Sequence, residues 1–181
     1  VAGLDDARRT VRGYYSGGTL CYEAQLVVGE LLGDVYSNEP LVAQNTLPAP
    51  DGAHVLLDLG AEEYTVGKPH PMIDPSTRIE MIREEARDPE VAAVLLDVVL
   101  GYGAHDDPAG ELGPALKEVM AGGGPQVVAY VLASASDPQG YDKTRKALED
   151  LGCIVTETAA RAAYVAAAIA ARRPELAAAA R

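Results

Sequence analysis

Short apolar runs alternate with longer stretches of helical periodicity along most of the chain. Three of the five apolar runs are nearly continuous in Val, Leu and Ile, a pattern typical of strands buried on both faces of a parallel sheet. The predicted strands are Val11–Tyr15, Val55–Leu59, Ala93–Val99, Val127–Leu132 and Ile154–Thr156. The predicted helices are Leu20–Leu32, Ser76–Arg87, Glu111–Ala121, Tyr141–Leu151 and Ala159–Arg172.

This alternation predicts an α/β fold built on one doubly wound, mostly parallel, five-stranded sheet. We expect a single domain over residues 1–173, followed by an Ala-rich helical tail over residues 174–181 that frays. The stretch 33–53 is interrupted by prolines and predicts a long surface excursion before the second strand. Within that excursion, Val42–Leu47 could add a short edge strand.

The composition limits the classes of partner that we expect. Apolar residues make up 48% of the 181 residues, and the absence of Phe and Trp makes the core aliphatic. A net charge of −12 repels phosphate backbones and anionic lipid, so we expect neither nucleic acid nor membrane as a partner. A small anion must therefore bind through local donors. Cys21 and Cys153 lie far apart in apolar runs, which predicts buried free thiols in a reducing cytoplasm.

In an open parallel sheet, ligands bind at the carboxyl ends of the strands. Four of the loops that follow the predicted strands are rich in Gly, Ser, His or Asp, whereas the loops at the opposite edge read as plain turns. The four loops are Ser16–Thr19, Gly60–Asp74, Gly101–Pro108 and Ala133–Gln139. This asymmetry predicts a functional edge.

The first of these loops predicts a phosphate site. Gly17 and Gly18 allow a ligand to approach the backbone, and Ser16 and Thr19 offer hydroxyl donors. The free N–H groups and the dipole of the following helix favour negative charge at the same place. The alternative is that Ser16 or Thr19 merely caps the helix.

Two histidines are candidate catalytic residues. His70 stands between two prolines that stiffen its presentation, which suits a proton carrier or an anion ligand. Asp74 reads more simply as the cap of the next helix. His105, with its neighbouring aspartates, could suggest a metal site, but no matching ligands stand elsewhere. We therefore expect this loop to form a wall over a substrate, to which Tyr102 contributes.

Three further side chains complete the candidate site. Asp97 lies inside an apolar predicted strand, where a carboxylate needs a partner. It could bond the N–H groups of a neighbouring loop, which is a structural role, or act in the site. Ser134 and Ser136 follow the fourth strand and could donate hydrogen bonds to a substrate.

The loop motifs resemble a known family. The segment 16–24, Ser-Gly-Gly-Thr-Leu-Cys-Tyr-Glu-Ala, is similar to the segment that opens the second, CoA-ligase domain of succinyl-CoA synthetase α chains. The FdrA branch is the most similar, through the motif His70-Pro-Met-Ile-Asp, the run Leu96–His105 and the motif Asp137-Pro-Gln-Gly. The resemblance covers nearly the whole chain and implies a flavodoxin-like domain.

The resemblance also bears on chemistry. In the synthetases, the helix start that matches residues 16–19 stabilises a phosphorylated histidine or an acyl phosphate. Those enzymes carry the histidine in a Gly-His-Ala-Gly segment after the fourth strand, whereas residues 134–140 here contain no histidine. The FdrA branch is linked to purine (allantoin) breakdown as part of an oxamate carbamoyltransferase assembly. That reaction needs sites for phosphate and carboxylate but no phosphohistidine.

Three functional hypotheses follow. The first is a domain that binds phosphate, or an acyl or carbamoyl phosphate, in a carbamoyltransferase-type assembly. The second is the α-type domain of an acid–CoA ligase, and the third is a non-catalytic domain that docks a partner or senses an anion. No cofactor is specified by the residues themselves; phosphate, CoA or a nucleotide would be bound together with other domains. The resemblance implies an upstream CoA-binding-like domain or a second subunit, and a homo-oligomer is compatible with it.

Overall fold

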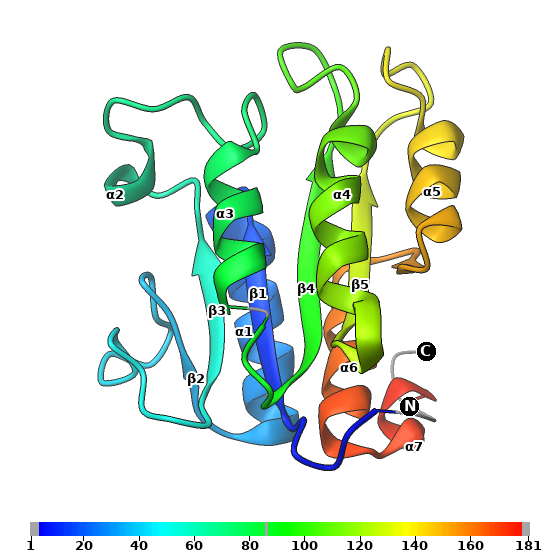
Figure 1. The fold of residues 1–181 in the computed structure, drawn as a ribbon. Helices are drawn as coiled ribbons and strands as arrows, with labels where there is room; N and C mark the ends of the chain where they lie inside the picture. Colours follow the sequence, from blue (N-terminus) through cyan, green and yellow to red (C-terminus); the bar gives the residue numbers. More distant parts are fainter. Residues whose placement is uncertain (1–3, 86, 179–181) are drawn as a thin grey trace.

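The computed structural model describes residues 4–85 and 87–178. Within these residues, strands that are all parallel form one six-stranded sheet in the order β2-β3-β1-β4-β5-β6 (Figure 1). The strands are β1 (Thr10–Tyr15), β2 (Val35–Tyr36), β3 (His54–Asp58), β4 (Val91–Val99), β5 (Gln126–Leu132) and β6 (Ile154–Thr156). The predicted α/β class and the parallel sheet are confirmed, with one more strand than expected.

Helices cover both faces of the sheet. Helices α3, α4 and α5 lie on the face nearest the viewer in Figure 1, and α1 and α6 lie behind it. The main helices are α1 (Gly18–Leu32), α3 (Ser76–Glu85), α4 (Pro108–Met120), α5 (Tyr141–Asp150) and α6 (Ala159–Ala171). The short helices are α2 (Glu62–Thr65), the 3-10 turn Ala121–Gly123 and α7 (Pro174–Ala178). Of the predicted tail, residues 174–178 are therefore helical and residues 179–181 lie outside the described part.

The additional strand was missed because two residues carry no readable alternation. Val35 pairs with His54, and Tyr36 pairs with Val55, at the edge of the sheet. The edge strand predicted at Val42–Leu47 is wrong, because that segment makes only an isolated bridge between Ser37 and Thr46. The excursion is anchored instead by Gln25 of α1. The Gln25 side chain donates to the carbonyl of Glu39 and accepts the N–H of Leu41.

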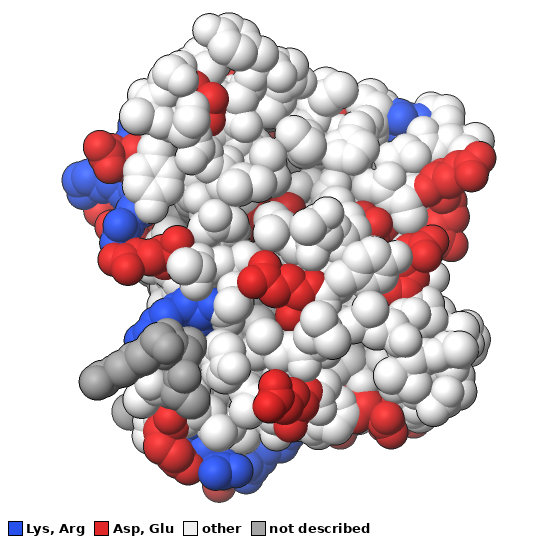
Figure 2. All heavy atoms as spheres, turned by 180° about the vertical axis from the view of Figure 1, so that it is seen from behind, with Lys and Arg blue, Asp and Glu red and all other residues white. Residues whose placement is uncertain are grey.

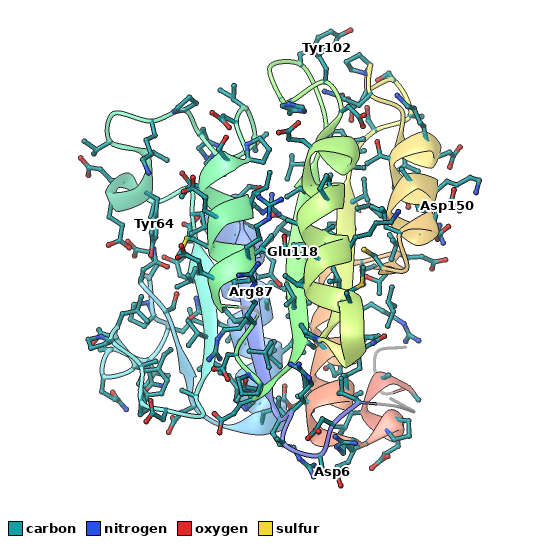
Figure 3. The ribbon with its side chains drawn as sticks, viewed as in Figure 1. Asp6, Tyr64, Arg87, Tyr102, Glu118 and Asp150 are labelled. Atoms are coloured by element: carbon teal, nitrogen blue, oxygen red, sulfur yellow. The ribbon has the colours of Figure 1, made fainter. Side chains whose placement is uncertain are left out.

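The sheet separates two apolar cores. On the α3–α5 face, large aliphatic side chains such as Leu96, Leu112 and Leu116 fill the space. On the α1–α6 face, α6 presents alanines at Ala162, Ala163, Ala166 and Ala170, so its backbone packs close to the strands. At the outer surface of the first face, Arg87 and Glu118 point toward one another, and Glu118 also pairs with Arg83, which links α3 to α4 (Figure 3).

Both cysteines are buried and free, as predicted. Burial raises the pKa of the Cys21 thiol to about 12 and that of the Cys153 thiol to about 11. No helix of the described residues combines the length and the apolar character that a membrane crossing requires.

The assignment of the core can be tested by making the same Ile→Ala substitution at a buried and at an exposed position. Ile82 is fully buried between α3 and the sheet, whereas Ile73 is 54% exposed in the loop before α3. Ile82→Ala should lower the free energy of unfolding by about 2–5 kcal/mol, because it removes buried methyl groups and leaves a cavity. Ile73→Ala should change it by about 0.5 kcal/mol or less. Urea unfolding followed by circular dichroism measures both, and equal losses would contradict the assignment of the core.

The thiols give a second test. Because the thiolate is the reactive form, a pKa raised by about 2 units or more lowers the reactive fraction about 100-fold or more at pH 8. The folded chain should therefore react with iodoacetamide at least about 100-fold more slowly than the urea-unfolded chain. Cys153→Ser leaves Cys21 as the reporter for α1, and rapid labelling of that folded variant would show that α1 does not bury Cys21.

Candidate functional site

The carboxyl ends of β1, β3 and β4 lie side by side at one edge of the sheet. β1 is the switch point, because the chain pairs β3 along one side of it and β4 along the other. Tyr15, the last residue of β1, is in register with Asp58, the last residue of β3. In β4, Leu96 is in register with Tyr14, and Asp97 is the next residue. Two carboxylates thus flank the loop that begins at Ser16.

Asp97 is held by the protein on both of its carboxylate oxygens. Oδ1 accepts the backbone N–H of Ser16 at 2.9 Å, and Oδ2 accepts the Ser16 hydroxyl at 2.6 Å. The guanidinium of Arg78 lies 2.8 Å from Oδ1, and its Nε donates to the carbonyl of Tyr14. Asp97 is 1% exposed and Arg78 3%. Of the two roles left open for Asp97, this geometry favours the structural one, because both oxygens have protein donors and the side chain is buried away from a substrate.

Helix α1 begins without a side-chain cap. Gly17 is its N-cap, and no described side chain accepts a hydrogen bond there. The Ser16 hydroxyl, which could have capped the helix or contacted a ligand, is turned to Asp97 instead. Among the donors predicted to bind phosphate, those that remain available to a ligand are the N–H groups of Gly17, Gly18 and Thr19 and the exposed Thr19 hydroxyl.

Asp58 stands beside this helix start. It is 8% exposed, and its Oδ1 accepts the N–H of Gly60 at 2.9 Å. Its Oδ2 lies 3.0 Å from the point where a Cβ on Gly18 would stand. Asn38 holds the backbone of Asp58 from the excursion, since its side-chain amide both donates to the Asp58 carbonyl and accepts the Asp58 N–H, each at 3.0 Å. Burial, and then the charges of Glu39 and Asp97, raise the pKa of Asp58, against the opposing hydrogen bond from Gly60.

His70 faces the same place from the loop before α3. Its Nδ1 accepts the N–H of Met72 at 3.2 Å, so the proton of the neutral ring is on Nε2. Nε2 lies 2.9 Å from the Cβ position of Gly60, and Asp58 Oδ1 lies 3.1 Å from that same point. Among the predicted residues, His70 is therefore the histidine that the fold brings to Asp58 and the Ser16 carbonyl.

His105 lies in the loop after β4, the strand that pairs with β1 on the side opposite β3. It lines a small cavity under α3 and α4 together with Ser16 and Arg78. Its N–H donates to the carbonyl of Met72 at 2.8 Å, and its own carbonyl accepts from the Gln139 side chain at 3.2 Å. His105 thereby joins three of the four predicted loops to one another.

The remaining predicted residues lie away from α1. Tyr102 is 92% exposed and points into solvent from the tip of the loop between β4 and α4 (Figure 3). Ser134 and Ser136 form a local turn, in which the Ser134 hydroxyl donates to Asp137 and lies 3.0 Å from the Ser136 hydroxyl. They follow β5, and β4 separates that strand from β1. The described residues hold no group of three or more His, Cys, Asp and Glu side chains that could bind a metal ion.

Sequence reasoning missed Arg78, Asp58 and Asn38. A signal for Arg78 was present, because it stands four residues before Ile82 on the buried stripe of α3 and a buried carboxylate at Asp97 required a cation. Asp58 closes an apolar strand just as Asp97 interrupts one. Nothing in the sequence pointed to Asn38, because its partner is the backbone of Asp58, twenty residues further along the chain.

Comparison with known proteins gives two findings. A sequence profile of the CoA-ligase family matches residues 14–169. Among curated proteins, the uncharacterized protein YahF of Escherichia coli (strain K12) is 38% identical over 172 residues. That alignment covers 91% of this chain and 33% of YahF, so the chain spans about a third of the length of this relative. The broader family resemblance is confirmed, and the resemblance to the FdrA branch stays a prediction.

The buried ion pair predicts an asymmetric response to mutation. Asp97→Asn leaves Arg78 charged and without its counter-ion, and should lower the free energy of unfolding by about 3–5 kcal/mol. The matched change Asp150→Asn breaks the exposed pair with Lys146 and should cost about 0.5 kcal/mol or less. If urea unfolding gave equal losses, the network would not be a structural centre.

Proposed function

The chain belongs to the CoA-ligase family, and on this premise we propose that it binds phosphate, or the phosphate end of an acyl or carbamoyl phosphate, at the start of α1. The observation that carries the proposal is the uncapped helix start at Gly17, placed at the carboxyl edge of a parallel sheet. An oxyanion there would accept from the first N–H groups of α1 and gain from the helix dipole.

The surrounding charge makes these donors important. The chain carries a net charge of −12. Figure 2 shows acidic side chains spread over the face that carries α1 and α6, with basic side chains near its margins. An anion that reaches α1 therefore gains little from long-range attraction and depends on short contacts with the loop.

For the reaction, the proposal is transfer of an acyl or carbamoyl group to or from phosphate, in an oxamate carbamoyltransferase-type assembly. The N–H groups of α1 would stabilise negative charge that develops on the phosphate oxygens. His70 Nε2 lies near Gly60 and Asp58 at the same edge, which supports the proposal that His70 carries a proton there. The absence of histidine from residues 134–140 agrees with chemistry that forms no phosphohistidine in that loop.

A second candidate is an acid–CoA ligase domain, which the family match favours. Incubation with ATP labelled on its terminal phosphate distinguishes the ligase from direct acyl or carbamoyl transfer. Phosphorylation of a histidine supports the ligase, and its absence supports direct transfer. In both cases the matching relative is about three times longer than this chain. An upstream CoA-binding-like domain, or a second subunit, is therefore part of the proposal.

The site is tested by substitutions at Gly17. This residue has φ −169°, which any residue adopts, and no atom lies within 4 Å of its Cβ position. Gly17→Asp places a carboxylate on the helix start, where it caps the helix and competes with an anion. We expect unchanged or slightly higher stability and loss of anion binding, while Gly17→Ala retains binding.

The measurement is the thermal shift with phosphate, carbamoyl phosphate, oxamate, succinate and CoA, added separately. A ligand at 100-fold over its Kd stabilises the folded chain by about 2.7 kcal/mol. A shift with phosphate or carbamoyl phosphate that Gly17→Asp abolishes supports the proposal. A shift that persists in Gly17→Asp places the anion elsewhere, and no shift with any of these compounds contradicts an anion site in this chain.

A further inference from the structure

The helix start already has an acidic neighbour. Asp58 is more than nine-tenths buried, and its Oδ2 faces the first helical residue of α1 at Gly18. Gly60 occupies Oδ1, and no hydrogen-bond partner of Oδ2 is found among residues 4–85 and 87–178. Oδ2 is directed at the place where an anion is proposed to bind, and it is therefore available to accept a hydrogen bond from a ligand there.

Binding of a fully ionised oxyanion at the start of α1 is energetically unfavourable while the neighbouring Asp58 carboxylate is also ionised. Both are acceptors, so neither supplies the proton that a hydrogen bond between them needs. With one proton between them, the pair instead forms a short, charge-assisted hydrogen bond. That proton comes either with the anion, as a hydroxyl group, or from solvent.

We propose that Asp58 makes the α1 site selective for an oxyanion that carries a hydroxyl group, such as inorganic phosphate, over one that does not, such as sulfate. This inference rests on the proposed anion site at α1. It names the substrate class of that site as protonated phosphates, and it requires that an acyl or carbamoyl phosphate dianion takes up a proton as it binds.

The charges around Asp58 favour retention of that proton. Burial and the carboxylates of Glu39 and Asp97 raise the pKa of Asp58, while the hydrogen bond from Gly60 and the charge of His70 lower it. Tyr22 and Cys21 of α1 lie near enough to interact with Asp58, and burial raises the pKa of each of these groups. Arg78 is already paired with Asp97, so it does not neutralise Asp58.

The experiment is titration calorimetry of the folded chain with phosphate and with sulfate, at pH 6 and pH 8. At pH 8 the wild-type chain should bind phosphate about 10- to 100-fold more tightly than sulfate, as expected for one hydrogen bond to a charged group. Sulfate binding should strengthen toward pH 6, because solvent then supplies the proton more readily.

Asp58→Asn replaces the acceptor with an amide that can also donate. In this variant sulfate should bind within about threefold of phosphate at both pH values, because the amide satisfies either anion. The control is Asp51→Asn, which removes an exposed carboxylate of the same charge and should keep the wild-type preference. His70→Gln removes the neighbouring imidazole and tests whether the histidine, rather than Asp58, selects the anion.

The outcomes separate this inference from the proposed function. Equal binding of phosphate and sulfate by the wild-type chain at pH 8 overturns the selectivity and leaves the anion site intact. Loss of the preference in His70→Gln, with the preference kept in Asp58→Asn, assigns the selection to the histidine and also overturns it. No binding of either anion by the wild type or by Asp58→Asn, with circular dichroism unchanged, overturns the anion site itself.

Discussion

The buried contact between Asp97 and Arg78 is the constraint on which the candidate site depends. Three elements meet there, because Arg78 comes from α3, Asp97 from β4, and the Ser16 donors from the end of β1. A desolvated ion pair adds little net stability, since the attraction between the charges is offset by their lost hydration. Its effect here is positional: it fixes where β1 stops and draws the Ser16 hydroxyl inward, and α1 is therefore left to begin at two glycines.

That arrangement explains which parts of the molecule the sequence could predict. The five longer strands and their helices follow from apolar patterning, which reports burial directly. The roles of Ser16 and Asp97 depend on one another and on Arg78, which lies 62 residues from Ser16 along the chain. A pattern of single residues shows that each is unusual but not which of them will pair. The two-residue strand β2 and the contact of Asn38 with the Asp58 backbone escape prediction for the same reason, because both are set by tertiary neighbours.

The edge that we predict to be functional combines features with opposite effects on an anion. The uncapped helix attracts negative charge, while Asp58 and the net charge of the chain repel it. A site made only of cations would bind many anions, whereas donors placed beside a buried acceptor discriminate among them by their protons. Family membership and the parallel-sheet edge predict where a site would lie, and the proposed selectivity rests on the opposition between the helix start and Asp58.

The hydrogen bonds among the loops have a mechanical consequence. His105 is tied to Met72 through its N–H, and Gln139 is tied to Gly101 and to His105, so the loops after β3, β4 and β5 form one connected rim. The loop after β4 is bonded to both of the others, so displacing it would break contacts with each of them, and displacing either outer loop would break that loop's contacts with the loop after β4. In the first loop, by contrast, Ser16 is held by Asp97, and the space around the Cβ position of the next residue, Gly17, is open.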